Sequence, residues 1–116
     1  MDLAERKDSA QAGGGSGGAA GELLLLEGAA LLRSGKAAEA ADLFGEAAAL
    51  LSEDGDLPAL LRARLALGSA LRESGQLRRA RETLAGVLSE ARLEGFSALT
   101  VDALTLLAGV ASSARQ

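Results

Sequence analysis

Few residues of this sequence have types and spacings that could support chemistry. An arginine cluster in residues 78–81 could bind a phosphate, but arginines on a helix surface are usually solvated. The acidic turn at 53–56 lacks the twelve-residue pattern and the terminal Glu of a calcium loop. The Gly-rich stretch 13–18 lacks the Lys-Ser/Thr pair of a phosphate-binding loop. None of these segments predicts a catalytic, cofactor or metal site.

Composition points the same way. The chain of 116 residues has no His, the commonest general base, and no Cys, so it has no thiolate metal site and no disulfide. Ala and Leu dominate its apolar residues, and these residue types favour helices. We therefore predict a helical, non-catalytic protein that needs no cofactor.

A pattern with a period of forty residues runs through the chain. Small, apolar and turn residues recur at this spacing: Gly28, Ala30, Leu31, Ser34, Gly35 and Ala40 return as Gly68, Ala70, Leu71, Ser74, Gly75 and Ala80. A fixed period in this size range is typical of stacked helical repeats. Such arrays usually present a binding surface, so the period favours partner binding over catalysis.

The elements that must carry this surface are five predicted helices. Apolar spacing places them at 22–34, 37–52, 57–74, 77–93 and 98–113. Glycines at 35, 75 and 95 supply left-handed ends, and Asp56 and Ser97 are the predicted N-caps of the third and fifth helices. Short connections make neighbouring helices antiparallel. Residues 1–21 are rich in Gly and Ser and predict a disordered tail, which leaves 22–116 as the helical domain.

The repeat resembles the tetratricopeptide repeat, in which Leu-Gly, a turn glycine and small residues of the second helix recur. The matching residues are Leu24, Gly28, Leu31, Gly35, Ala40, Phe44 and Ala47, then Leu67, Gly68, Leu71, Gly75, Ala80, Leu84 and Val87. The period of forty exceeds the usual length of about 34 residues. Trp and Tyr of the consensus are missing, and Glu27 stands where Leu is usual. The resemblance implies an all-α solenoid of antiparallel helix pairs with about five helices, or two and a half repeats.

In this family, peptides bind on the concave face that the first helix of each pair lines. Carried over by position, the resemblance implies these partner-binding residues: Leu25, Leu32, Arg33, Arg62, Leu65, Ser69, Arg72 and Thr105, with Glu22, Ala29, Glu73, Asp102 and Gly109 on the same face. Leucines beside arginines would suit an amphipathic helix or an acidic peptide. We therefore expect an interaction scaffold or adaptor that binds a peptide or helix on this face.

The last predicted helix supports an alternative. It carries Leu or Val on both sides, which is unusual for the solubilising end of a repeat array. The alternative is a self-associating structural or regulatory module, a fragment of a longer repeat protein, that docks through this helix.

Charge is distributed unevenly about a net value of −4. Residues 22–56 carry eight acids and two bases, whereas residues 57–92 carry seven arginines and three glutamates. The two repeats complement each other within one molecule, or they support head-to-tail self-association or a charged partner. A negative net charge argues against nucleic acid as a partner, and the lack of an apolar run approaching about 18 residues argues against a membrane. The expected location is the cytoplasm, with the nucleus as the alternative. The expected partner is a protein or peptide, with a second copy of the chain as a further candidate.

Overall fold

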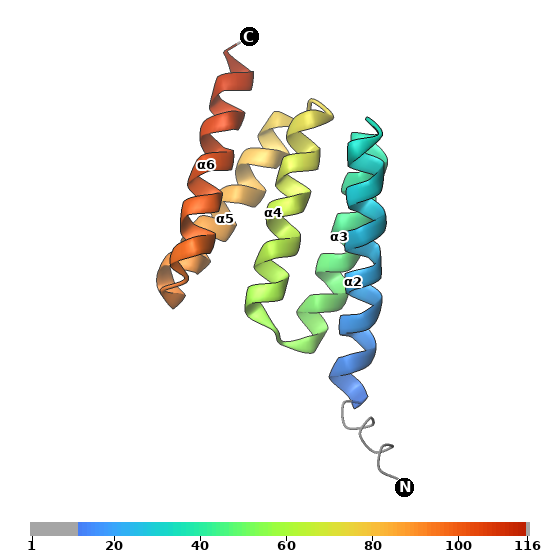
Figure 1. Ribbon diagram of the computed structural model, residues 1–116. Coiled ribbons are helices and arrows are strands. Elements are labelled where there is room, and N and C mark those ends of the chain that lie inside the picture. Colours follow the sequence, from blue (N-terminus) through green and yellow to red (C-terminus); the bar gives the residue numbers. More distant parts are fainter. Residues whose placement is uncertain (1–11, 116) are drawn as a thin grey trace, which may run out of the picture.

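The computed structural model describes residues 12–115 and shows five helices and no strand within them (Figure 1). The helices are α2 (Ala12–Arg33), α3 (Ala37–Asp54), α4 (Leu57–Glu73), α5 (Leu77–Glu94) and α6 (Ser97–Ala114). The last four agree with the predicted helices to within two residues at each end. The prediction of an all-α chain with five helices is thus confirmed for the described residues.

The first helix differs from its prediction. It begins at Ala12, well before the expected start at residue 22. Gly21 is buried against α3, and a Cβ added there would lie 2.9 Å from Cγ of Leu51. Glycine therefore lets the end of α3 approach α2 closely, and this packing outweighs the low helix propensity of the segment. The structure thus places residues 12–21, which the sequence assigned to a tail, in α2, and residues 1–11 lie outside the described part of the chain.

Glycines end the helices as their forty-residue spacing predicts. Gly35, Gly75 and Gly95 have φ angles of +84°, +87° and +76°, a left-handed conformation that favours glycine. The residue after each glycine donates its backbone N–H to a carbonyl five positions earlier, as in the bond from Lys36 to Leu31 at 2.9 Å. This 6→1 bond closes the helix end and turns the chain back on itself.

The two predicted N-caps have different outcomes. The carboxylate of Asp56 accepts a hydrogen bond from the backbone N–H of Ala59 at 3.1 Å, which confirms it as the cap of α4. The prediction for Ser97 was wrong, because Ser97 is the first residue of α6. Phe96 takes the cap position without a side-chain hydrogen bond, since its side chain carries no acceptor.

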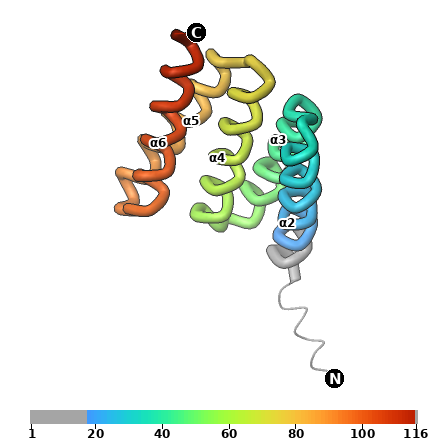
Figure 2. Tube along the Cα trace, turned by 45° about the horizontal axis from the view of Figure 1, so that its top comes forward, coloured from blue at the N-terminus to red at the C-terminus, as the bar shows by residue number. Residues whose placement is uncertain are grey.

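Consecutive helices run antiparallel and pack against each other (Figures 1 and 2). In both views α2, α4 and α6 run in one direction, and α3 and α5 return between them on one side. α4 and α6 also contact each other directly, whereas α2 and α4 make no comparable contact. The direct contact of α4 with α6 is the feature that positions the candidate site.

The same packing recurs within the first two helix pairs. A Cβ added at Gly28 would lie 2.5 Å from Cε1 of Phe44, and one at Gly68 would lie 2.5 Å from Cγ of Leu84. Phe44 and Leu84 are both buried. The bulky residue of the second helix therefore rests on a glycine of the first, which holds the two helix axes close together.

The helix α6 combines an apolar sequence with low burial. It is the one helix among the described residues that is long and apolar enough to cross a membrane, with a mean hydropathy of 1.4. Only 17% of its residues are buried in the structure. The absence of a membrane partner stays a prediction, and the apolar surface of α6 requires an explanation.

Candidate functional site

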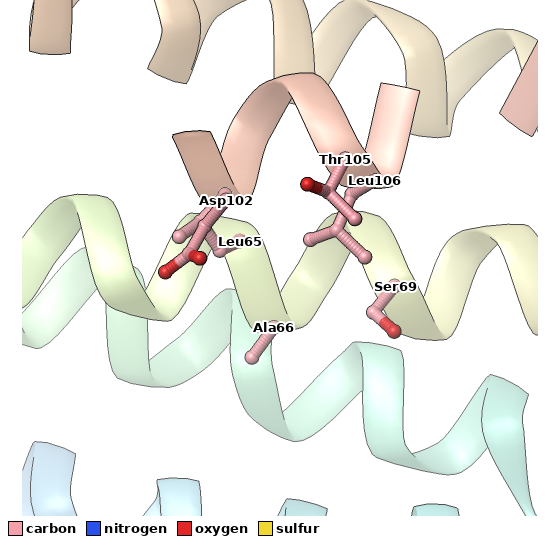
Figure 3. Close-up of a pocket in the computed structure, with 6 residues that line it drawn as sticks. All are labelled: Leu65, Ala66, Ser69, Asp102, Thr105 and Leu106. Carbon is pink, nitrogen blue, oxygen red and sulfur yellow. The ribbon is translucent and has the colours of Figure 1, made fainter. Parts of the chain in front are cut away.

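A hollow of about 320 Å³ lies between α4 and α6 (Figure 3). Its lining residues come from one face of each helix: Leu65, Ala66, Ser69, Asp102, Thr105 and Leu106. Figure 3 shows Asp102 beside Leu65 at one end of the hollow and Ser69 toward the other. The lining surface is mainly apolar, with hydroxyls and one carboxylate at its edges.

Helical spacing explains why these side chains meet. On α4, Ser69 follows Ala66 and Leu65 by three and four positions, and on α6 Thr105 and Leu106 follow Asp102 by three and four, so each set lies on one helix face. The two helices run in the same direction, and Leu65 lies beside Asp102, three positions before its forty-residue counterpart Thr105 (Figure 3). Ala66 contributes only a methyl group to the lining and therefore fills little of the space between the helices.

Arg72 holds the two helices together beyond the end of the hollow. Its Nε donates a hydrogen bond to Oγ of Ser113 at 3.0 Å. Its guanidinium also lies against Gly109, where an added Cβ would be 3.3 Å from Cζ of Arg72. Arg72, predicted to bind a partner, therefore has a structural contact that fixes the spacing of α4 and α6.

Two of the three polar groups at the edge of the hollow can only accept hydrogen bonds, and the third is the hydroxyl of Ser69. The hydroxyl of Thr105 donates its proton to the carbonyl of Val101 at 2.9 Å, so its oxygen can only accept from a ligand. The carboxylate of Asp102 likewise accepts only. Asp102 is the one charged residue that lines the hollow. The site is therefore suited to an apolar group that carries a cation or N–H donors beside it.

The other predicted site residues lie outside this hollow. Leu25 and Leu32 of α2 are half-buried and pack against the main apolar core. Arg33 and Arg62 are exposed, and neither lines the hollow. Since α2 and α4 lack the contact that α4 and α6 make, the structure does not extend the hollow to α2.

Three of the eight predicted residues line the hollow, namely Leu65, Ser69 and Thr105, and Asp102 of the same predicted face joins them. Ala66 and Leu106 were missed. Each directly follows a predicted residue in the sequence. A prediction that counted two residues per helical turn on the binding face would have included both. The prediction of site residues on α2 assumed that all helix pairs of the repeat are equivalent.

A second hollow lies on the side of the molecule where α3 and α5 run. Gly45, Ala48, Arg64, Leu67, Glu82, Thr83 and Gly86 line it. Arg64 also pairs with Glu90 of α5 at 3.1 Å, with both side chains partly exposed. This ion pair joins α4 to α5 on the side away from α6.

Two of the segments first considered for chemistry, 78–81 and 53–56, lie in α5 and at the junction of α3 and α4. Arg78, Arg79 and Arg81 are exposed, and Nη1 of Arg79 donates to Oε1 of Gln76 at 2.7 Å. Asp56 serves as a helix cap. Within residues 12–115, no group of three or more carboxylates is placed to hold a metal ion.

No protein-family model, no curated protein and no solved structure matches this chain. The resemblance to tetratricopeptide repeats therefore rests on the residues that recur every forty positions, such as Gly28 and Gly68, and stays a prediction.

Proposed function

We propose that this protein is a non-catalytic adaptor of the tetratricopeptide-repeat type, and that the face shared by α4 and α6 binds a helical peptide. The observation that carries the proposal is the apolar hollow of Leu65, Ala66 and Leu106. A volume of about 320 Å³ lies at the small end of the range of ligand pockets, about 300–1,000 Å³. A site of this size holds an anchoring side chain of a larger partner.

The partner on this proposal is an amphipathic helix with an apolar anchor and a Lys or Arg near it. The anchor fills the hollow, and the cation pairs with Asp102. Of the two partners expected from the sequence, an amphipathic helix and an acidic peptide, we favour the helix, because Arg72 is bonded to Ser113 and Asp102 is the charged residue that lines the hollow. Because Asp102 is exposed, this charge pair contributes specificity and faster association more than raw affinity.

The test selects amphipathic helical peptides on the immobilised full chain and measures their Kd by fluorescence polarisation. Ser69→Arg places a long side chain in the hollow and is expected to raise Kd at least about tenfold. Ser89→Arg is the matched control, because Ser89 is exposed on α5. It should leave Kd unchanged.

Charge provides a second test on the same peptides. Asp102→Asn is expected to raise the Kd of peptides that carry a cation and to leave the Kd of their neutral variants unchanged. The proposal fails if no peptide binds, or if Ser69→Arg and Asp102→Asn leave every Kd as it was.

A further inference from the structure

The exposed side of α6 carries a regular stripe that no described helix covers. The residues 97, 101, 104, 108, 111 and 115 follow one another at spacings of four and three, the heptad spacing of helices that pack side by side. All six are exposed, and Val101 and Leu104 keep 60% and 46% of their surface accessible. We call Val101, Leu104, Ala108 and Ala111 the α6 stripe.

The stripe occupies the positions that take the following helix in the two earlier pairs. By the forty-residue period it corresponds to Leu61, Arg64, Gly68 and Leu71 of α4, which face α5. Leu61 and Leu71 are completely buried there, and Arg64 bonds to Glu90 of α5. The α6 stripe is therefore a helix-packing surface by its place in the fold as well as by its residues.

A helix like α3 or α5 does not fit this surface in the same way. Phe44 rests on Gly28 and Leu84 on Gly68, at distances that leave no room for a Cβ. The equivalent residue of α6 is Ala108, whose methyl group stands in that place. The helix that covers the stripe must therefore present its large residues away from Ala108 or meet the alanine with a single well-placed side chain.

The stripe is complementary to itself when reversed. Its large residues, Val101 and Leu104, lie toward the start of α6, and its small residues, Ala108 and Ala111, lie toward the end. Two copies running antiparallel about a two-fold axis level with residue 106 place Leu104 opposite Ala108 and Val101 opposite Ala111. Every large side chain then meets a small one, so the helices approach closely without gaps.

We propose that two copies of this chain form an antiparallel, two-fold symmetric dimer through the α6 stripe. The stripe itself bears no charge, so nothing within it opposes the approach of a second stripe. Such a contact is closed, because the same patch serves on both partners. It uses a different side of α6 from Asp102 and Leu106, so it leaves the hollow open and does not depend on the proposed peptide binding.

Analytical ultracentrifugation of the full chain tests the dimer. The chain is expected to sediment as a dimer, and Leu104→Glu is expected to raise the dimer Kd at least about a hundredfold, since each interface then buries unpaired carboxylates. Leu93→Glu is the matched control, because Leu93 is 83% exposed on α5. It should not change Kd. A monomer at all concentrations, or equal effects of the two variants, overturns the proposal.

Exchange of sizes tests the pairing. Leu104→Ala leaves a gap opposite Ala108, and Ala108→Leu sets two leucines against each other, so each change alone should raise Kd about tenfold. The double variant restores one large and one small residue in each pair and should return Kd to within about threefold of the original. A patch that is merely sticky would instead bind more tightly with Ala108→Leu, and that result refutes the pairing.

Disulfide capture tests the direction, because the chain has no native Cys. Val101→Cys and Ala111→Cys, mixed under oxidising conditions, should link to each other and not to themselves. Like residues of an antiparallel pair lie about 15 Å apart along the axis, beyond the ~7 Å limit between the Cα atoms of a disulfide. Links between like residues indicate a parallel pair and overturn the proposal. A membrane-binding monomer would also overturn the proposal. Such a monomer would pellet with vesicles of phosphatidylcholine and phosphatidylserine only when Leu104 is intact, because the stripe would then face a membrane.

Discussion

Replacing Gly68 by Ala should destabilise the protein although alanine is the better helix former. A Cβ at residue 68 would lie 2.5 Å from Cγ and Cδ2 of Leu84, whose side chain is completely buried. Overpacking of a core costs about 1–3 kcal/mol, and contacts this short belong in the upper part of that range, about 2–3 kcal/mol. The gain in helix propensity is about 1 kcal/mol. The net loss of unfolding free energy is therefore about 1–2 kcal/mol.

Gly86 provides the matched control. It lies in the interior of α5, and a Cβ added there meets no atom within 4 Å. Gly86→Ala therefore gains helix propensity without a clash and should stabilise the fold by about 0.5–1 kcal/mol. The two variants make the same chemical change in two helix interiors and should move stability in opposite directions.

Urea unfolding followed by far-ultraviolet circular dichroism measures both effects, and it suits a chain without Trp or Tyr. A double variant, Gly68→Ala with Leu84→Ala, isolates the clash, because removing the leucine side chain removes what the new methyl group meets. Its cost should be smaller than the sum of the single costs. If Gly68→Ala stabilises the chain as much as Gly86→Ala does, the close approach of α4 and α5 is refuted.

Three further predictions concern the helix ends and the ion pair, and thermal or urea unfolding measures each. Asp56→Ala removes the cap of α4 and should cost about 1 kcal/mol, whereas Lys36→Ala, at a cap position without a side-chain bond, should cost almost nothing; equal costs would contradict the capping role. Gly95→Ala forces an L residue to a φ of +76° and should lower the free energy of unfolding by about 1–2 kcal/mol; an unchanged stability would contradict the left-handed conformation at this residue. The coupling between Arg64 and Glu90 in a double-mutant cycle should be below about 1 kcal/mol and should fall in high salt, since both side chains are partly exposed; a larger, salt-independent value would show that the pair is less accessible than the structure indicates.

The sequence predicted the helix ends well because their signals are local. A glycine at 35, 75 or 95 needs no distant partner to adopt a left-handed conformation, and Asp56 caps the helix that follows it directly. The predicted start of α2 differs from the observed start because the relevant signal is not local. Glycine lowers helix propensity, and the close approach of Gly18 to Asp54 and of Gly21 to Leu51, both contacts with α3, is not visible from the segment itself.

Only some of the residues that line the candidate site were predicted, because the prediction treated the repeat as uniform. Arg72 ties α4 to α6 through Ser113 and rests on Gly109. One period earlier the corresponding residues are Leu32, Glu73 and Ser69, which cannot form this bond. The contact of α4 with α6 thus depends on residues in which the copies differ, and a pattern built on the residues that they share does not reveal it.

The two proposals together account for the composition of α6. A helix that is apolar on every side is normally buried, yet only Leu99, Ala103 and Val110 of α6 are. One side is packed into the core, a second contributes Leu106 to the hollow, and the third carries Leu104 in the exposed stripe. Each side therefore has its own use, and the uses can be separated. Leu104→Glu should abolish dimerisation and leave peptide affinity intact, whereas Ser69→Arg should do the reverse. If either variant abolished both activities while the helical content stayed unchanged, the two surfaces would be one site and the division of α6 would be wrong.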